Sequence, residues 1–122
     1  MGLDQNALGQ LRELDPDGSS GTLAQIINSY LADAQGLIEK MRVALSANDM
    51  VTLARHAHSL KSTSLSLGAT RVSEIARDME NAVKSKAVDA CPVLLMALSA
   101  EYAAAERLLI AEREAVKKAS PT

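Results

Sequence analysis

A helical hydrophobic repeat that runs through residues 23–45 is the strongest constraint on how this chain can fold. Apolar side chains recur there at intervals of three and four residues, so they share one face of an α-helix. They are Leu23, Ile26, Ile27, Tyr30, Leu31, Ala34, Leu37, Ile38, Met41 and Leu45. An apolar stripe of about six helical turns must be buried against other elements of comparable length.

Three further segments carry the same repeat and are candidates for the elements that bury it. Their inward-facing residues are Leu53, Ala57, Leu60, Ser64 and Leu67 in the first, Val72, Ile75, Ala76, Met79 and Val83 in the second, and Leu94, Leu95, Leu98, Tyr102, Ala105, Leu108, Leu109 and Val116 in the third. A shorter repeat of leucines after Asp4 predicts a short amphipathic helix over residues 4–14.

Helix-capping residues stand where these repeats begin and end. The predicted caps are Thr22 with Gln25 as a capping box, Asn48 and Asp49 between two helices, Gly68 as a left-handed C-terminal cap, Thr70, and Asp89 shortly before Pro92. The connections are therefore short, which places consecutive helices side by side and antiparallel. The sequence predicts an all-α fold, an antiparallel up-down-up-down four-helix bundle with a short extra N-terminal helix.

The breaks in the pattern also predict the domain organisation. Residues 1–21 form a short N-terminal helix and loop, residues 22–118 form the bundle, and residues 119–122 are a disordered tail. The turn-rich segment 15–21 is either a hinge for the first helix or a simple surface loop, and the pattern leaves both open. The highly charged segment 112–118 is expected to protrude or fray.

Composition narrows the class of protein. The chain is 48% hydrophobic without Trp or Phe, which favours helices over sheets. A net charge of −2 argues against a nucleic-acid binder, and no apolar run approaches the roughly 20 residues of a membrane span. Cys91 has no second cysteine to pair with, and no signal peptide is recognisable, so a cytoplasmic location is expected.

A second line of residues runs along the helix predicted over residues 53–67, about 100° round from its apolar stripe. It contains His58, Lys61, Ser62 and Leu65, at i, i+3, i+4 and i+7. Neutral imidazole is a good nucleophile near pH 7, and Lys61 can supply the positive charge that phosphoryl transfer requires. From the helix pattern alone, a structural histidine and a solvated surface lysine remain open alternatives.

The second histidine, His56, lies about 200° round the helix from His58, so the two cannot share one phosphoryl group or one metal ion. We interpret His56 as a peripheral histidine. No His-Cys cluster and no Glu-x-x-His pair is present in the sequence, which argues against a zinc or di-iron site. No Gly-rich loop with Gly-Lys-Ser/Thr and no Gly-x-Ser-x-Gly motif is present either. No cofactor is therefore expected, and the sequence shows no means of binding ATP.

The segment from His58 to Ala69 resembles the histidine-containing phosphotransfer (HPt) domain family. The family pattern is a histidine, two residues, a lysine, usually a glycine, and a second glycine six residues later. Here it reads His58-Ser59-Leu60-Lys61-Ser62 and then Gly68-Ala69, with Ala57 and Leu67 also similar to the family. The departure is Ser62 at the usual glycine, which leaves the approach to His58 slightly more hindered. The resemblance covers roughly residues 20–115.

This resemblance implies a phosphorelay intermediate without an ATP site of its own. His58 would accept a phosphoryl group from the aspartate of a receiver domain in a hybrid sensor kinase and pass it to a response regulator. Lys61 would stabilise the phosphoryl group, Ser62 would keep the approach clear, and any Mg²⁺ would belong to the receiver. The docking face would include Val51, Ala54, Arg55 and Leu65 around the histidine. A monomer is expected.

Two other classes of protein share parts of this pattern. A non-catalytic helical adaptor would keep the bundle and bind a signalling partner without phosphotransfer, and Ser62 is the residue that favours it. His58 and Lys61 together argue against it, because an adaptor needs neither. A dimerising histidine-kinase bundle fits poorly, since a chain of 122 residues has no room for the ATP-binding domain.

Overall fold

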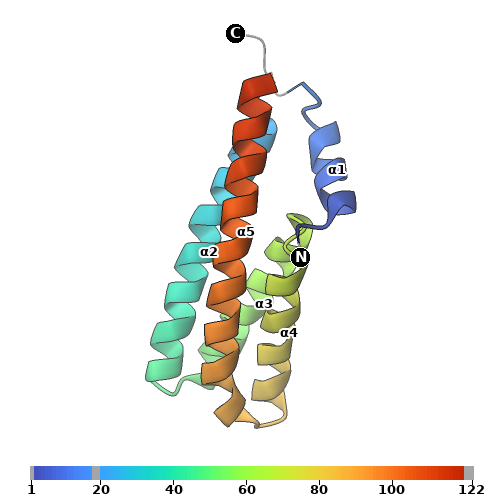
Figure 1. The fold of residues 1–122 in the computed structure, drawn as a ribbon. Helices are drawn as coiled ribbons and strands as arrows, with labels where there is room; N and C mark the ends of the chain where they lie inside the picture. The colour runs from blue at the N-terminus through green and yellow to red at the C-terminus, as the bar shows by residue number, and fades with distance from the viewer. Residues whose placement is uncertain (1, 18–19, 120–122) are drawn as a thin grey trace.

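The fold is an antiparallel helical bundle, seen in a computed structural model that describes residues 2–17 and 20–119. Within these residues the elements are α1 (Gln5–Glu13), α2 (Thr22–Ser46), α3 (Met50–Ser66), α4 (Thr70–Lys84), the 3₁₀ helix η1 (Val88–Ala90) and α5 (Cys91–Ala119). The helices α2 to α5 run alternately down, up, down and up in the view of Figure 1. The predicted all-α bundle with an extra N-terminal helix is confirmed. Ala119, predicted to open a disordered tail, is the last residue of α5, and residues 120–122 lie outside the described residues.

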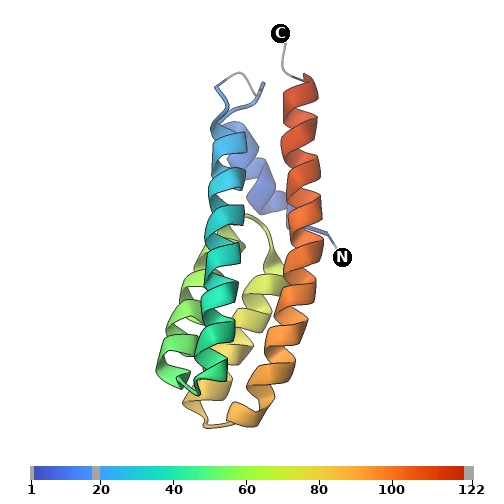
Figure 2. The same cartoon turned by 90° about the vertical axis from the view of Figure 1, so that its left-hand side faces the viewer.

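Helix length explains where α1 lies. The first and last helices of the bundle, α2 and α5, have 25 and 29 residues, whereas α3 and α4 between them in the chain have 17 and 15. At 1.5 Å per residue, α2 and α5 extend about 12 Å or more beyond the α3–α4 turn. The nine-residue α1 lies above that turn, beside the projecting ends of α2 and α5 (Figure 2). It thereby covers apolar surface that the shorter helices leave open.

The predicted apolar stripes supply most of the core. Six of their residues are only partly buried, namely Ile26, Leu37, Ile38, Leu45, Val83 and Leu94, and the core also contains Ala44, Ala82 and Cys91, which were not predicted. All five stripe residues of α3 are buried, including Ser64, whose hydroxyl lies 2.7 Å from the buried Tyr30 hydroxyl of α2. Leu8 of α1 is 1% exposed and belongs to the same core. The prediction for Leu108 is wrong, since its side chain is 40% exposed. The side chain of Val116 lies outside the described part of the chain.

Three helices end in the same hydrogen-bonded motif, in which the chain turns through a left-handed residue. That residue is Asn48 after α2, Gly68 after α3 and Lys86 after α4, with φ of 56°, 78° and 62°. After α3, Gly68 N–H donates to Leu65 C=O at 3.1 Å and Ala69 N–H donates to Ser64 C=O at 2.9 Å. The predicted roles of Gly68 and Asn48 are confirmed.

The N-terminal caps were predicted less well. Asp49 caps α3 as predicted, and its carboxylate accepts from the Thr52 N–H at 3.2 Å. Thr22 and Thr70 are instead the first residues of their helices, with Gly21 and Ala69 at the cap positions. Asp89 lies inside η1, one turn before α5. Each threonine thus stands one residue after the cap position, and neither Gly21 nor Ala69 makes a side-chain capping hydrogen bond.

The N-terminal segment is anchored at both of its ends. Asp4 N–H donates to Gly68 C=O at 2.7 Å, and Arg12 pairs with Glu112 of α5 at 2.6 Å. Farther along α5, Arg113 donates to Asn28 of α2 at 2.6 Å. The prediction that α5 protrudes or frays from residue 112 is therefore wrong for Glu112 and Arg113, because Glu112 binds α1 and Arg113 binds α2.

Gly68 and Gly36 form a matched pair for testing the turn. A methyl group at Gly68 would sit 2.8 Å from the Asp4 carbonyl oxygen and would occupy a left-handed conformation, whereas one at Gly36 would meet nothing within 4 Å. We expect Gly68→Ala to destabilise the protein by about 1–2 kcal/mol or more, and Gly36→Ala to stabilise it by about 0.5–1 kcal/mol. Urea denaturation of both variants measures this, and equal effects would contradict the role assigned to Gly68.

Candidate functional site

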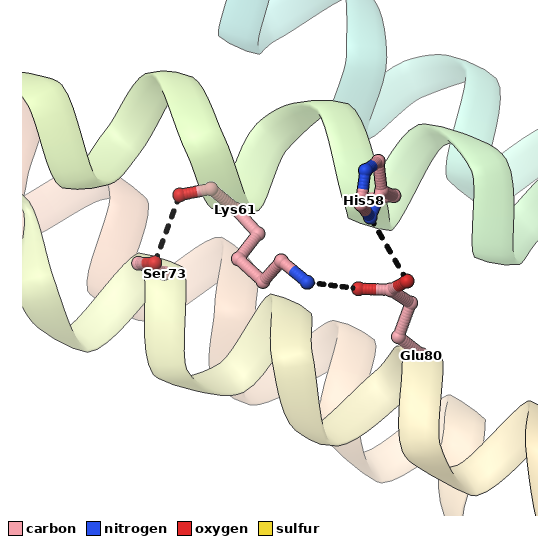
Figure 3. Close-up of polar contacts among 4 residues, drawn as sticks. All are labelled: His58, Lys61, Ser73 and Glu80. Atoms are coloured by element: carbon pink, nitrogen blue, oxygen red, sulfur yellow. Dashed lines mark hydrogen bonds and ion pairs between the residues drawn. The ribbon is translucent and has the colours of Figure 1, made fainter.

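The site is built around one carboxylate that contacts two side chains of the neighbouring helix. Glu80 of α4 lies with one oxygen 3.0 Å from His58 Nδ1 and the other 2.7 Å from Lys61 Nζ, both on α3 (Figure 3). The His58 side chain is 62% exposed, that of Lys61 is 29% exposed and that of Glu80 is 13% exposed. The carboxylate is therefore held close to the protein while the imidazole extends into solvent.

The environment of Glu80 keeps its carboxylate ionised. The hydrogen bond from Lys61 is the largest influence and lowers the pKa of Glu80 below its ordinary value. Partial burial opposes this change, and the hydrogen bond with His58 and the positive charge of Lys61 reinforce it. Glu80 is thus an acceptor at neutral pH.

An ionised carboxylate determines which tautomer His58 adopts. A carboxylate can only accept hydrogen bonds, so Nδ1 of His58 must carry the proton in this contact. The neutral ring then has its lone pair on Nε2, at the opposite edge of the ring. An exposed imidazole with an oriented ring and a free Nε2 lone pair is suited to nucleophilic attack on a group carried by another molecule.

Two hydrogen bonds hold α3 in place behind the site. Ser73 of α4 donates its hydroxyl proton to the Lys61 carbonyl oxygen at 2.8 Å (Figure 3). On the opposite side of α3, Ser64 and Tyr30 form the buried pair that links α3 to α2. Desolvation of Tyr30 raises its pKa, so the phenol stays protonated and able to donate. The helix that carries His58 is fixed from both neighbouring helices.

The structure brings together the predicted line of surface residues. Val51 is 70% exposed and Leu65 is 55% exposed, two turns before and two turns after His58. Arg55 and Ser62 are exposed as well, and Ala54 is half-buried. Gly68 ends the same helix, as predicted.

His56 lies apart from this line. It is half-buried, and together with Arg55 it lowers the pKa of Asp49, although the hydrogen bonds from Thr52 are the larger cause. His56 therefore interacts electrostatically with the capping carboxylate at the start of α3.

Glu80 and Ser73 are site residues that the sequence analysis missed. A signal for them existed, because Ser73 and Glu80 are seven residues apart and so share one face of α4. Gly68 makes α3 and α4 antiparallel, and Glu80 and His58 are roughly equidistant from it along the two helices. Choosing Glu80 among the acidic residues of α4 needed the exact register of that helix pair.

Other kinds of site find no support in the part of the chain that the structure describes. No group of three or more His, Cys, Asp or Glu side chains is placed to hold a metal ion there. Over residues 2–17 and 20–119, no helix combines the length and the apolar character needed to cross a bilayer.

Comparison with known proteins places the chain in a family. The family model described as Hpt domain matches residues 25–108, which include the whole of α3 and α4 and most of α2. The chain belongs to the Hpt domain family. The matched region contains His58, Lys61 and Glu80, and it ends within α5, so α1 lies outside it.

Several curated proteins are similar to this Hpt chain. Histidine-containing phosphotransfer protein 2 of Arabidopsis thaliana is 28% identical over 98 residues, covering 78% of this chain and 63% of the relative. Multistep phosphorelay regulator 1 of Schizosaccharomyces pombe is 29% identical over 79 residues, covering 65% of this chain and 27% of the relative. The chain thus spans less than two thirds of the length of either protein.

Two solved structures share the fold. Histidine-containing phosphotransfer protein B of Pseudomonas aeruginosa PAO1 superposes with a TM-score of 0.84 at 24% identity, covering 92% of this chain and 94% of that one. The phosphotransfer protein MtHPt2 of Medicago truncatula gives a TM-score of 0.76 at 26% identity, covering 96% and 78%. The bundle is therefore the Hpt architecture.

The role of Glu80 in setting the tautomer can be tested by NMR. In the wild type we expect ¹⁵N shifts of neutral His58 to report a proton on Nδ1, because Glu80 accepts it. Glu80→Ala should shift the population towards the Nε2-protonated form. Glu74→Ala on the same helix, whose carboxylate pairs with Arg71, is the control and should leave the His58 spectrum unchanged. An unchanged tautomer in Glu80→Ala would refute the assignment.

The lowered pKa of Glu80 predicts an acid-dependent contribution to stability. Since folding lowers this pKa below its ordinary value of 4.5, the contribution is fully present above pH 4.5 and is lost as pH falls through the folded value. We expect the wild type to be more stable than Glu80→Gln at pH 7, with a difference that shrinks below pH 4.5. Thermal melts of both proteins between pH 7 and pH 3 measure it, and a constant difference would contradict the prediction.

Proposed function

We propose that this chain is a phosphotransfer intermediate of a multistep phosphorelay, with His58 as the phosphoacceptor. The observation that carries the proposal is the exposed imidazole whose Nδ1 is held by Glu80, which directs a lone pair to the outward Nε2. The names of the curated relatives support the same class of function.

The chemistry follows from these contacts. Nε2 of His58 attacks the phosphorus of an aspartyl phosphate on a receiver domain, the P–N bond forms and the P–O bond to the aspartate breaks. The ring keeps its Nδ1 proton, and Glu80 balances the positive charge that develops on the imidazole. Lys61, held by the same carboxylate, supplies positive charge beside the transferring group. The reverse reaction with a second receiver returns the phosphoryl group to an aspartate.

The surface around His58 is proposed as the docking face for both receivers. Val51 and Leu65 provide exposed apolar side chains, and Arg55 adds a positive charge. Ala54 and Ser62 are small residues beside them, so a partner can approach the ring closely. We extend the proposal to a cytoplasmic monomer without a cofactor, in which residues 22–118 form the transfer module and receive the phosphoryl group from another protein domain.

Substitution of the two histidines tests the proposed function. We expect His58→Gln to abolish labelling by a phosphorylated receiver while the helical content persists, because the nucleophilic nitrogen is removed. His56→Gln, one half-turn away on α3, is the matched control and should transfer within about twofold of the wild type. Acid-labile, base-stable label on the protein is the measurement. Phosphorylation of His58→Gln would refute the assignment, and a folded wild type that accepts label from no receiver would favour the adaptor.

A further inference from the structure

A hollow between α3 and α4 begins at Lys61 and extends along α3 to Leu65, in the direction that leads away from His58. Its volume is about 320 Å³, and it is lined by Lys61, Ser62, Leu65, Thr70, Ser73, Glu74 and Arg77. Two of its lining residues, Lys61 and Ser73, are drawn in Figure 3, where the Lys61 side chain extends towards Glu80. The hollow therefore borders the proposed docking face without containing the imidazole.

The charges around this hollow do not cancel. The ammonium of Lys61 is bound by Glu80, and the carboxylate of Glu74 is bound by Arg71 at 2.7 Å. Arg77 is exposed and makes no ion pair within residues 2–17 and 20–119. Its guanidinium is thus an uncommitted positive charge at the rim of the hollow.

The remaining lining groups suit a short acidic side chain. Ser62 is exposed and can donate a hydrogen bond, and Leu65 offers an apolar wall. The hydroxyl of Ser73 is already bonded to the Lys61 carbonyl oxygen. A carboxylate on a short aliphatic stem would place its methylene groups against Leu65 and its oxygens towards Arg77, where a bidentate contact is available.

We propose that this hollow receives an aspartate or glutamate side chain of the docking receiver domain, with Arg77 as the residue that determines which receivers are accepted. The inference rests on the proposed function, since it concerns the partner of the same site. The receiver would then contact this chain in two places. One is the apolar surface at Val51 and Leu65, and the other is Arg77 on α4.

The test compares charge reversals at two exposed arginines, one at the hollow and one away from it. Arg77→Glu should raise the KM for a phosphorylated receiver domain about tenfold at low salt, because it puts a negative charge where the partner's carboxylate must enter. Arg107→Glu, at an exposed position of α5 that does not line the hollow, is the control and should change the KM by less than about twofold. Arg77→Lys keeps the positive charge but cannot make the bidentate contact, so its KM should lie between those of the wild type and Arg77→Glu.

A second arm separates docking from the chemistry of His58. Phosphoramidate, a small phosphodonor that needs no protein docking, should label Arg77→Glu and the wild type at equal rates. Equal slowing with both donors would show that Arg77 acts on the imidazole and would overturn the docking role. Transfer from the receiver with an unchanged KM in Arg77→Glu would also overturn it, while leaving the proposed function intact. Failure of every receiver to phosphorylate the wild type would overturn both.

Discussion

The tight turn at Gly68 is the constraint on which the site depends. Its left-handed conformation ends α3 and lets α4 return directly alongside it, so two helices are held in one antiparallel register. That register places Glu80 opposite His58 and Lys61. The carbonyl oxygen of Gly68 also accepts the Asp4 N–H, so the same residue anchors the N-terminal segment. A side chain at this position would disturb the turn and the anchor together.

One carboxylate links the two functional side chains. Because Glu80 binds both His58 and Lys61, it orients the imidazole that we propose as the nucleophile and at the same time holds the lysine on the same side of α3. The two contacts also account for the lowered pKa of Glu80. Loss of Glu80 would therefore have two effects at once. The His58 ring would lose the contact that orients it, and the ammonium of Lys61 would lose its ion-pair partner.

The helices of the bundle differ in length, and this difference determines which surface of the bundle α1 covers. The short pair α3 and α4 carries the site, whereas α2 and α5 extend past it and are joined at that end by α1. Leu8 and the Arg12–Glu112 pair hold α1 in place, so the end of the core above the turn is closed. The surface of α3 around His58 is left open for a partner.

The sequence by itself determined the four helical stripes, the bundle they form, the turn at Gly68 and the line of His58, Lys61 and Leu65, because these follow from spacing within a single helix. Helix starts were less predictable, as Thr22 and Thr70 show. The identity of Glu80 and the anchoring of α1 were decided only by tertiary structure. Contacts between helices depend on register and rotation, and several acidic residues of α4 are equivalent until packing selects the one that faces α3.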